Sequence, residues 1–254
     1  MQWRADAVAG LFALLLATAW SPCGHAEAPA AAPPAATAES RLTPYKARYQ
    51  VSYRGISGGQ IESSLRKGTA PGLWMFESRP FPNLLGRVAI SPDARQRSTM
   101  EVAGTTVRPL QLVFDDGSDS GVKDVSATFE WPSGHVRGES KGKSFEMDVP
   151  PGTQDPASVQ PAMLAALLAG TEPRGFRILN GSRLETYRYW PEGRATVMTP
   201  YGQFETVVWA SQRDGSKRVN RVWHAPALGF VPVQAIQYNK GRPDVQMKLV
   251  ALER

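Results

Sequence analysis

The chain is poor in the residue types on which most catalytic and metal sites depend. Its 254 residues include one cysteine, Cys23, and three histidines. One cysteine cannot form an internal disulfide, and so few Cys and His side chains make a structural zinc site improbable. The fold must therefore be held by its hydrophobic core.

The sequence also lacks an apolar run of the roughly 20 residues that a membrane-spanning helix needs. The run from Val8 to Trp20 is shorter, follows the basic Arg4 and precedes small residues. This layout is typical of a secretory signal peptide. We expect residues 1–26 to be removed on export, by cleavage after Ala26 or after Ala28, which would leave a periplasmic protein.

A lipid anchor is the less favoured alternative. Cys23 follows the apolar run, but the three residues before it are Trp-Ser-Pro, where a lipidation signal wants small ones. Residues 27–42 are rich in Ala and Pro and predict a disordered leader. Residues 43–254 are long enough for a single β-rich domain with a sizeable core.

Acidic residues are in the minority. Lys and Arg number 29 against 23 Asp and Glu, which gives a formal net charge of +6. A basic surface suits nucleic acid or anionic lipid. An exported protein rarely meets nucleic acid, so we exclude that partner and retain peripheral contact with anionic lipid. The densest basic cluster, Arg213 to Arg221, predicts a hairpin tip with solvated flanks.

What the chain does contain is alternation. Tyr49, Val51 and Tyr53 share one face of a strand, and Gly58-Gly59 then supplies a turn. The same pattern recurs up to the last residues, with turn signals such as Glu192-Gly193 between segments. The sequence predicts a mainly β protein, a single curved antiparallel sheet or half-barrel of about ten strands.

One helical signal interrupts this pattern. Its capping residues and apolar spacing predict an amphipathic helix over Asp155–Ala169, with Gly170 as the stop. Pro161 would remove an internal hydrogen bond, so the helix either kinks there or begins nearby with Ser158 as its cap. We expect this helix to cover the concave face of the sheet.

A second irregular stretch, Ser78 to Ala94, carries apolar residues between prolines without a clear period. It includes Phe81, Leu84 and Leu85. It is either a loop tucked over the core or a mobile apolar rim at the mouth of a cavity.

No catalytic signature is convincing. The sequence GSDSG places Asp119 where an esterase elbow requires serine, and SLRK at Ser64 lies in a predicted strand without its companion motifs. We therefore predict a protein that is not an enzyme, with no catalytic residue and no cofactor. A hydrolase built from scattered carboxylates or a Ser/His pair stays open as a third alternative, with His224 and Asp155 as the residues to test.

Four acidic residues gather in one Gly/Ser-rich stretch. They are Asp115, Asp116, Asp119 and Asp124. Their oxygens could bind calcium, but the spacing departs from that of an EF-hand loop. We interpret them as a solvated tip and predict no metal site.

Aromatic residues are frequent on the predicted strands. Most should fill the core, and some could line a cavity for an acyl chain or another apolar ligand. The candidate lining residues are Trp74, Phe81, Leu84, Leu85, Trp131, Met163, Leu167, Trp209 and Trp223.

The order of these features resembles the bacterial exported family called domain of unknown function 3108. The resemblance rests on YKARYQVSYRGISGGQIESSLRK, PPGTQDPASVQPAMLAAL, TPYGQFETVVWASQ and RVWHAPALGFVPVQAIQ. It covers the chain from about Tyr45 to Leu252. It implies a shape similar to the curved half-barrels of bacterial lipoprotein carriers, and it implies no catalytic residue.

Two functions of different classes follow. The first is non-enzymatic binding of a lipid or another apolar envelope component in a curved-sheet cavity. The second is a structural or assembly factor that docks envelope proteins through strand edges or through the apolar stretch from Phe81 to Ile90. Neither the ligand nor the oligomeric state follows from the sequence.

Overall fold

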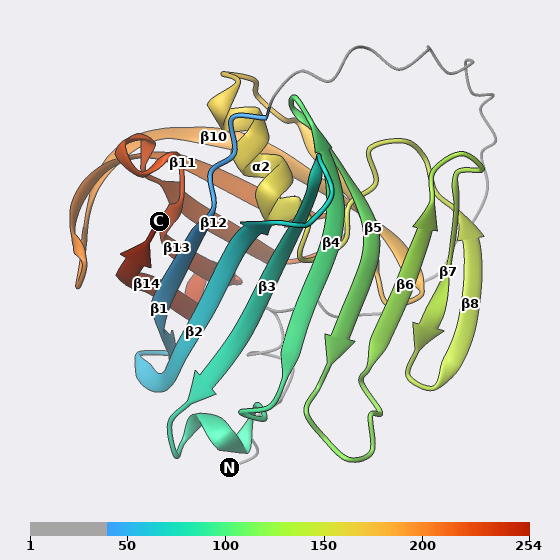
Figure 1. The fold of residues 1–254 in the computed structure, drawn as a ribbon. Coiled ribbons are helices and arrows are strands. Elements are labelled where there is room, and N and C mark those ends of the chain that lie inside the picture. The colour runs from blue at the N-terminus through green and yellow to red at the C-terminus, as the bar shows by residue number, and fades with distance from the viewer. Residues whose placement is uncertain (1–39) are drawn as a thin grey trace.

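The computed structural model describes residues 40–254, which form one large antiparallel sheet with a single α-helix (Figure 1). The predicted signal peptide, Cys23 and nearly all of the predicted leader lie outside the described residues. Within residues 40–254 no helix has the length and apolar character that crossing a bilayer requires.

The sheet has fourteen strands. They are β1 (Tyr45–Tyr53), β2 (Ile56–Lys67), β3 (Leu73–Pro82), β4 (Arg95–Ala103), β5 (Thr106–Asp115), β6 (Val125–Glu130), β7 (His135–Ser140), β8 (Lys143–Asp148), β9 (Gly175–Asn180), β10 (Arg183–Thr199), β11 (Gly202–Arg213), β12 (Arg218–His224), β13 (Pro232–Asn239) and β14 (Arg242–Glu253). Two short 3-10 helices, η2 (Gly86–Val88) and η3 (Pro226–Leu228), lie in connections.

The strand order is β8-β7-β6-β5-β4-β3-β2-β1-β14-β13-β12-β11-β10-β9. Every neighbouring pair is also adjacent in sequence, apart from β1 and β14, which pair over the register Lys46↔Glu253 to Tyr53↔Val245. The first and last strands therefore meet in the middle of the sheet. Its two edges, β8 and β9, come from the middle of the chain.

The predicted fold class is confirmed, but the predicted strand number was too low. One strand that the sequence prediction missed is the short β9, which pairs with β10 across the turn at Gly181 and Ser182. The predicted turn at Glu192-Gly193 was wrong, because β10 continues through it with a register shift between Pro191 and Gly193. A β-bulge and a turn use the same residue types, so the sequence does not separate them.

The segment from 149 to 174 links the two edges and carries α2 (Val159–Leu168). Ser158 is the N-cap residue, which confirms the alternative of a helix that begins near Pro161 and corrects the range Asp155–Ala169. Pro161 falls in the first turn, where its missing N–H leaves no hydrogen bond unmade. Gly170 ends the helix at a φ of 70°, as predicted.

The helix was expected to be amphipathic, and this was wrong. No residue of α2 is exposed, because the sheet bends into two walls with the helix between them (Figure 1). Leu164 packs in the main core, which draws residues from both walls, and Met163 and Leu167 pack around Trp209 of β11. A helix held from both sides is apolar all round.

The segment before β1 also contacts α2. Leu42 is buried in the main core, and Arg41 Nη1 donates a 3.2 Å hydrogen bond to the carbonyl of Leu168. This guanidinium satisfies a carbonyl at the C-terminal end of the helix, where a positive charge is favourable.

Candidate functional site

A cavity of about 210 Å³ lies between α2 and the concave face of the sheet. Its walls come from β1 to β4 on one side and from β10 to β14 on the other. The lining residues are Tyr45, Tyr49, Ser63, Phe76, Ser78, Gln96, Pro156, Val159, Gln160, Met163, Tyr189, Trp209, Ser211, Asn220, Arg221, Val222, His224, Pro232, Ala235, Ile236, Gln237 and Met247. Its volume is below the roughly 300–1,000 Å³ of a drug-sized ligand site, so it suits one narrow chain.

The apolar part of the cavity is built from large, fixed side chains. Tyr45 and Tyr49 alternate inward on β1, and burial raises the pKa of both hydroxyls, so they stay neutral. The Tyr49 hydroxyl donates a 3.0 Å hydrogen bond to the carbonyl of Pro232. Met163 of α2 and Trp209 of β11 contribute from the opposite side.

A polar stripe crosses the β2–β4 part of the same surface. Ser63 faces Ser78 in the strand register, and Ser78 faces Gln96. The hydroxyls of Ser63 and Ser78 lie 2.9 Å apart and share a hydrogen bond. All three residues are buried, and they present polar atoms to the cavity. The two serine hydroxyls are hydrogen-bonded to each other, as buried polar groups usually are.

Two further polar groups at the cavity have a defined hydrogen-bonding role. His224 Nδ1 lies 2.9 Å from the carbonyl of Phe230, which makes Nδ1 the protonated nitrogen and leaves Nε2 as an acceptor. Burial lowers the His224 pKa to about 4, so the ring is neutral. Nε2 of Gln160 is a buried donor with no protein partner in the described part of the chain.

The residues singled out for hydrolysis do not form a catalytic arrangement. His224 Nδ1 contacts the main-chain carbonyl of Phe230 and His135 Nδ1 contacts Asp148, and within residues 40–254 no hydrogen bond joins either histidine to a serine, the pairing on which histidine-assisted nucleophilic catalysis depends. Asp155 is buried outside the cavity lining, where its carboxylate accepts hydrogen bonds from Ser98 Oγ and from the main chain of Ala157. Burial raises the Asp155 pKa to about 6 although these donors favour the charged form.

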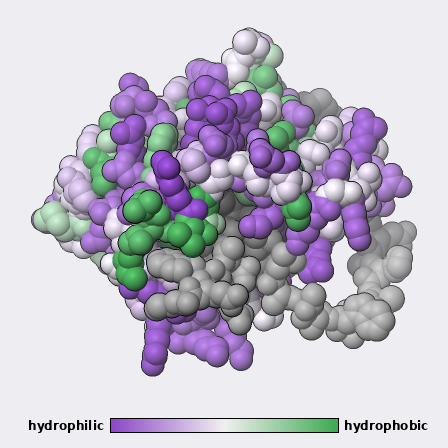
Figure 2. All heavy atoms as spheres, turned by 90° about the horizontal axis from the view of Figure 1, so that it is seen from below, coloured by the Kyte–Doolittle hydropathy of each residue, from purple (hydrophilic) through white to green (hydrophobic). Residues whose placement is uncertain are grey.

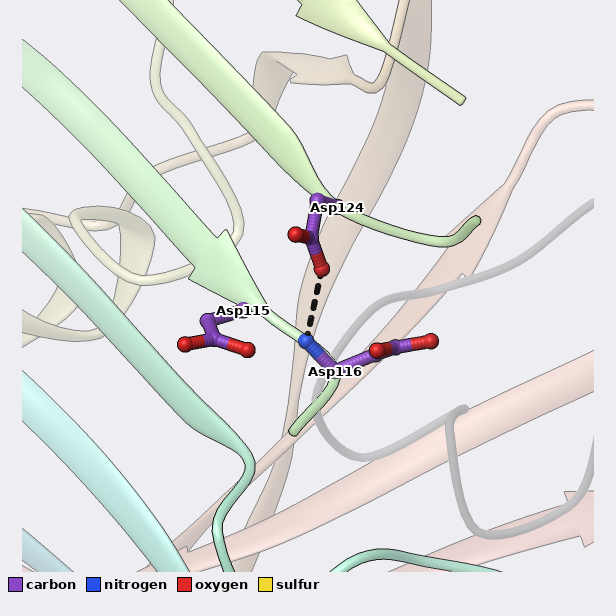
Figure 3. Close-up of side chains that lie close together, drawn as sticks. All are labelled: Asp115, Asp116 and Asp124. Atoms are coloured by element: carbon purple, nitrogen blue, oxygen red, sulfur yellow. Dashed lines mark hydrogen bonds between the residues drawn. The ribbon is translucent and has the colours of Figure 1, made fainter. Parts of the chain in front are cut away.

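The acidic loop after β5 holds its carboxylates close together (Figure 3). Oxygens of Asp115, Asp116 and Asp124 lie within 4.8 Å of one another. Asp124 accepts from the Asp116 N–H at 2.9 Å, and Asp115 accepts from the Gly117 N–H at 2.7 Å. These carboxylates therefore order the loop through its own backbone N–H groups.

The structure brings together only part of the predicted lining set. Met163 and Trp209 line the cavity, and Leu167 packs in the same apolar cluster as both. Trp74 is buried in the main core with Lys67 Nζ 5.7 Å from its ring centroid. Trp223 is half-buried against that core and is also outside the lining.

The remaining predicted residues lie elsewhere. Trp131 follows β6, stacks on Phe129 and donates a 2.7 Å hydrogen bond from Nε1 to the carbonyl of Pro109. Phe81, Leu84 and Leu85 are exposed around the start of the β3–β4 connection. Figure 2 shows apolar side chains gathered on the face of the molecule seen from below.

The predicted lining set left out the polar lining residues, above all Ser63 and Gln160, and His224 was named only for the hydrolase alternative. A signal for Ser63 was present, because it lies between Ile61 and Leu65 on the inward face of an alternating strand. A polar residue at an inward position marks a surface that is not ordinary core.

The family model described as "Protein of unknown function (DUF3108)" matches residues 48–248. The search of curated proteins finds no match. A crystal structure of a "Beta-barrel-like Protein of Domain of Unknown Function DUF1849 from Brucella abortus" is similar in fold, with 19% identity, 85% of this chain and 99% of that chain covered, and a TM-score of 0.51.

Two more distant solved structures are the Pseudomonas aeruginosa MucA/MucB complex and a Bacteroides fragilis protein with a YmcC-like fold. The first has 13% identity, with 83% of this chain and 51% of that chain covered, and a TM-score of 0.37. The second has 12% identity, with 83% and 95% covered, and a TM-score of 0.38. At such scores neither likeness bears on function.

Proposed function

The chain belongs to the DUF3108 family, whose function is unknown, and from that premise we propose that it is a non-enzymatic protein of the bacterial envelope that binds one apolar chain of a lipid-like ligand. The binding site is the cavity between α2 and the concave face of the sheet. The observation that carries this proposal is the cavity itself, about 210 Å³ lined from both walls and from the helix.

The lining indicates the chemical class of the ligand. Tyr45, Tyr49, Met163 and Trp209 supply apolar surface that suits methylene groups. Gln160 Nε2 supplies an unpartnered donor, which a ligand carbonyl or ester oxygen would satisfy. An acyl chain with an oxygen-bearing head group matches both features.

The absence of a catalytic arrangement in the described residues supports binding over turnover. The neutral His224 ring has its Nδ1 fixed by Phe230, which leaves Nε2 to accept a hydrogen bond. In the proposal this nitrogen orients the head group and moves no proton. Export to the periplasm, expected from residues 1–26, places the protein where envelope lipids are its surroundings.

Docking of an envelope protein through the strand edges has less support. β8 is short and presents Lys143, Glu146 and Asp148 as exposed charged residues. β9 is flanked by Gln154, whose N–H and carbonyl bond to the main chain of Arg177 and Leu179. Charge on one edge and cover on the other are the usual means of preventing strand addition.

Native mass spectrometry of the protein isolated from the periplasm without detergent tests the proposal. A bound species of lipid mass, identified after extraction, is the expected result. A clean apo mass, together with no uptake of fluorescent fatty-acid probes, would remove the proposal.

A matched pair of variants ties the ligand to this cavity. Ala235 lines it, so Ala235→Phe should fill the space and abolish lipid binding while the protein stays folded. Ala251 pairs with Arg48 on the convex face of the sheet, so Ala251→Phe should leave binding unchanged. Equal loss in both variants would mean that the ligand is bound elsewhere.

A further inference from the structure

The connection between β3 and β4 presents a cluster of exposed apolar side chains that no described residue covers. This apolar tip consists of Phe81, Leu84, Leu85 and Val88, with exposed fractions of 50%, 84%, 52% and 70%. It lies at the end of the sheet where η2 is seen in Figure 1, and apolar atoms gather on the corresponding face in Figure 2. A patch of large side chains at such exposure marks a surface that meets another phase or molecule.

The apolar tip is held on a firm base. Asn83 donates from its main chain to the carbonyl of Gly58 and from Nδ2 to the carbonyl of Ser57. Its Oδ1 accepts from the Gly86 N–H at 2.9 Å. A Cβ at Gly86 would lie 2.0 Å from the Gly58 carbonyl oxygen, so the two backbones touch. This fixed backbone holds the leucines outward, although burial would be the cheaper arrangement for them.

Cations surround the tip on the side of β1 and β14. Arg87 is exposed within the tip, and the guanidinium of Arg48 lies 5.8 Å from the Phe81 ring centroid. The β1–β2 and β13–β14 hairpin turns lie at the same end of the sheet as the tip and add the exposed Arg54, Lys240 and Arg242. These three line a common groove with Asp244, whose carboxylate pairs with Arg54.

We propose that this end of the sheet docks on the surface of an anionic phospholipid membrane. The apolar tip enters the boundary between head groups and acyl chains, and the hairpin cations meet the phosphates. Buried apolar area and basic residues together are what interfacial binding requires, because each alone gives weak, reversible attachment.

The acidic loop fixes the direction of approach. Ser91 Oγ donates to the carbonyl of Gly117, so the loop that carries Asp115 to Asp124 lies against the β4 side of the connection. Its carboxylates would be repelled by anionic lipid. The molecule therefore tilts toward β1 and β14, where the cations are.

Vesicle sedimentation of the mature full-length chain tests this. Binding to phosphatidylglycerol vesicles is expected to exceed binding to phosphatidylcholine vesicles and to fall with added salt. Equal binding to both lipids, or no binding to either, would overturn the proposal.

Variants assign the contact to the tip. The double change Leu84→Ser and Leu85→Ser should lower the partition coefficient by more than about tenfold, since each leucine gives up a buried apolar side chain. Lys240→Gln and Arg242→Gln should each lower it about fivefold. Met198→Ser is the matched control, because Met198 is 63% exposed beside the β10–β11 turn at the opposite end of the sheet.

The same variants separate this inference from lipid binding in the cavity. The tip residues are outside the cavity lining, so the Leu84→Ser and Leu85→Ser protein should still carry its ligand in native mass spectrometry. Unchanged vesicle binding by that variant would show that the tip is not the contact.

Discussion

The hydroxyl of Ser98, on β4, donates a 2.6 Å hydrogen bond to the carboxylate of Asp155, in the segment that joins the two edges of the sheet. The other carboxylate oxygen accepts from the N–H groups of Ala157 and Ser158 at 2.7 Å each. Asp155 thus connects the segment just before α2 to strand β4. The shape of the cavity depends on this contact, because the helix that it positions carries the lining residues Val159, Gln160 and Met163.

Ser98→Ala should destabilise the protein by about 1–3 kcal/mol, because it removes one donor from a buried carboxylate. Urea denaturation followed by circular dichroism measures the change. Ser126→Ala, at an exposed position on β6, serves as the control and should stay within about 0.5 kcal/mol of the wild type. Equal effects at the two serines would contradict the role given to Ser98.

Asp155 and His224 should give opposite dependences of stability on pH. The Asp155 pKa is about 6 in the folded protein against an ordinary 3.8. The contribution of this shift to the free energy of unfolding is therefore fully present below pH 3.8 and is lost as the pH rises through 6. The His224 pKa is about 4 in the folded protein against an ordinary 6.5. The contribution of this shift to the free energy of unfolding is therefore fully present above pH 6.5 and is lost as the pH falls through 4. Each shift corresponds to on the order of 3 kcal/mol.

Single variants separate the effects of Asp155 and His224 on the pH dependence of stability. Between pH 6.5 and 4.5, Asp155→Asn should lose more stability on acidification than the wild type, and His224→Asn should lose less. Denaturation at both pH values gives the two differences. Parallel pH profiles for all three proteins would mean that neither group titrates differently in the folded and unfolded states.

Tyr49→Phe should cost about 1 kcal/mol, because the carbonyl of Pro232 loses its buried donor. Tyr45→Phe is the matched change on the same strand and in the same cavity, and the Tyr45 pKa is raised by burial alone. It should be close to neutral. Thermal unfolding measures the loss of stability in each variant. A larger loss for Tyr45→Phe than for Tyr49→Phe would be inconsistent with a stabilising hydrogen bond from Tyr49 to Pro232.

Gly86→Ala should loosen the apolar tip, because its Cβ would collide with the Gly58 carbonyl oxygen. We expect faster amide exchange at Ala89 and Ile90, whose N–H groups both bond to the Gly86 carbonyl. Gly58→Ala is the control, since its Cβ would meet nothing nearer than 3.9 Å. Exchange rates that do not differ between the variants would argue against a fixed tip.

The local structure was largely predictable from the sequence. Period-2 alternation identified most of the antiparallel strands, Gly170 marked the end of the helix, and Ser158 was one of the two predicted starts. The pairing of β1 with β14 was not predictable, because alternation shows which face a strand buries and not which distant strand lies beside it.

The candidate site was predictable only in part for the same reason. Met163 and Trp209 line the cavity. Trp74 and Trp131 have the same side chain as Trp209, but they pack in or against the main core and do not line the cavity. Side-chain type indicates that a residue prefers burial, whereas the curvature of the sheet decides whether it faces a cavity or the core.

The meeting of the first and last strands has a consequence for how the chain folds. β1 has one sequence neighbour beside it in β2, but its second neighbour in the sheet, β14, is the last of the described strands in chain order. The meanders β2–β8 and β9–β14 are chains of local hairpins and can form quickly, whereas the seam between β1 and β14 requires closure of nearly the whole chain. We therefore expect the slow step of folding to be the joining of the two walls around α2.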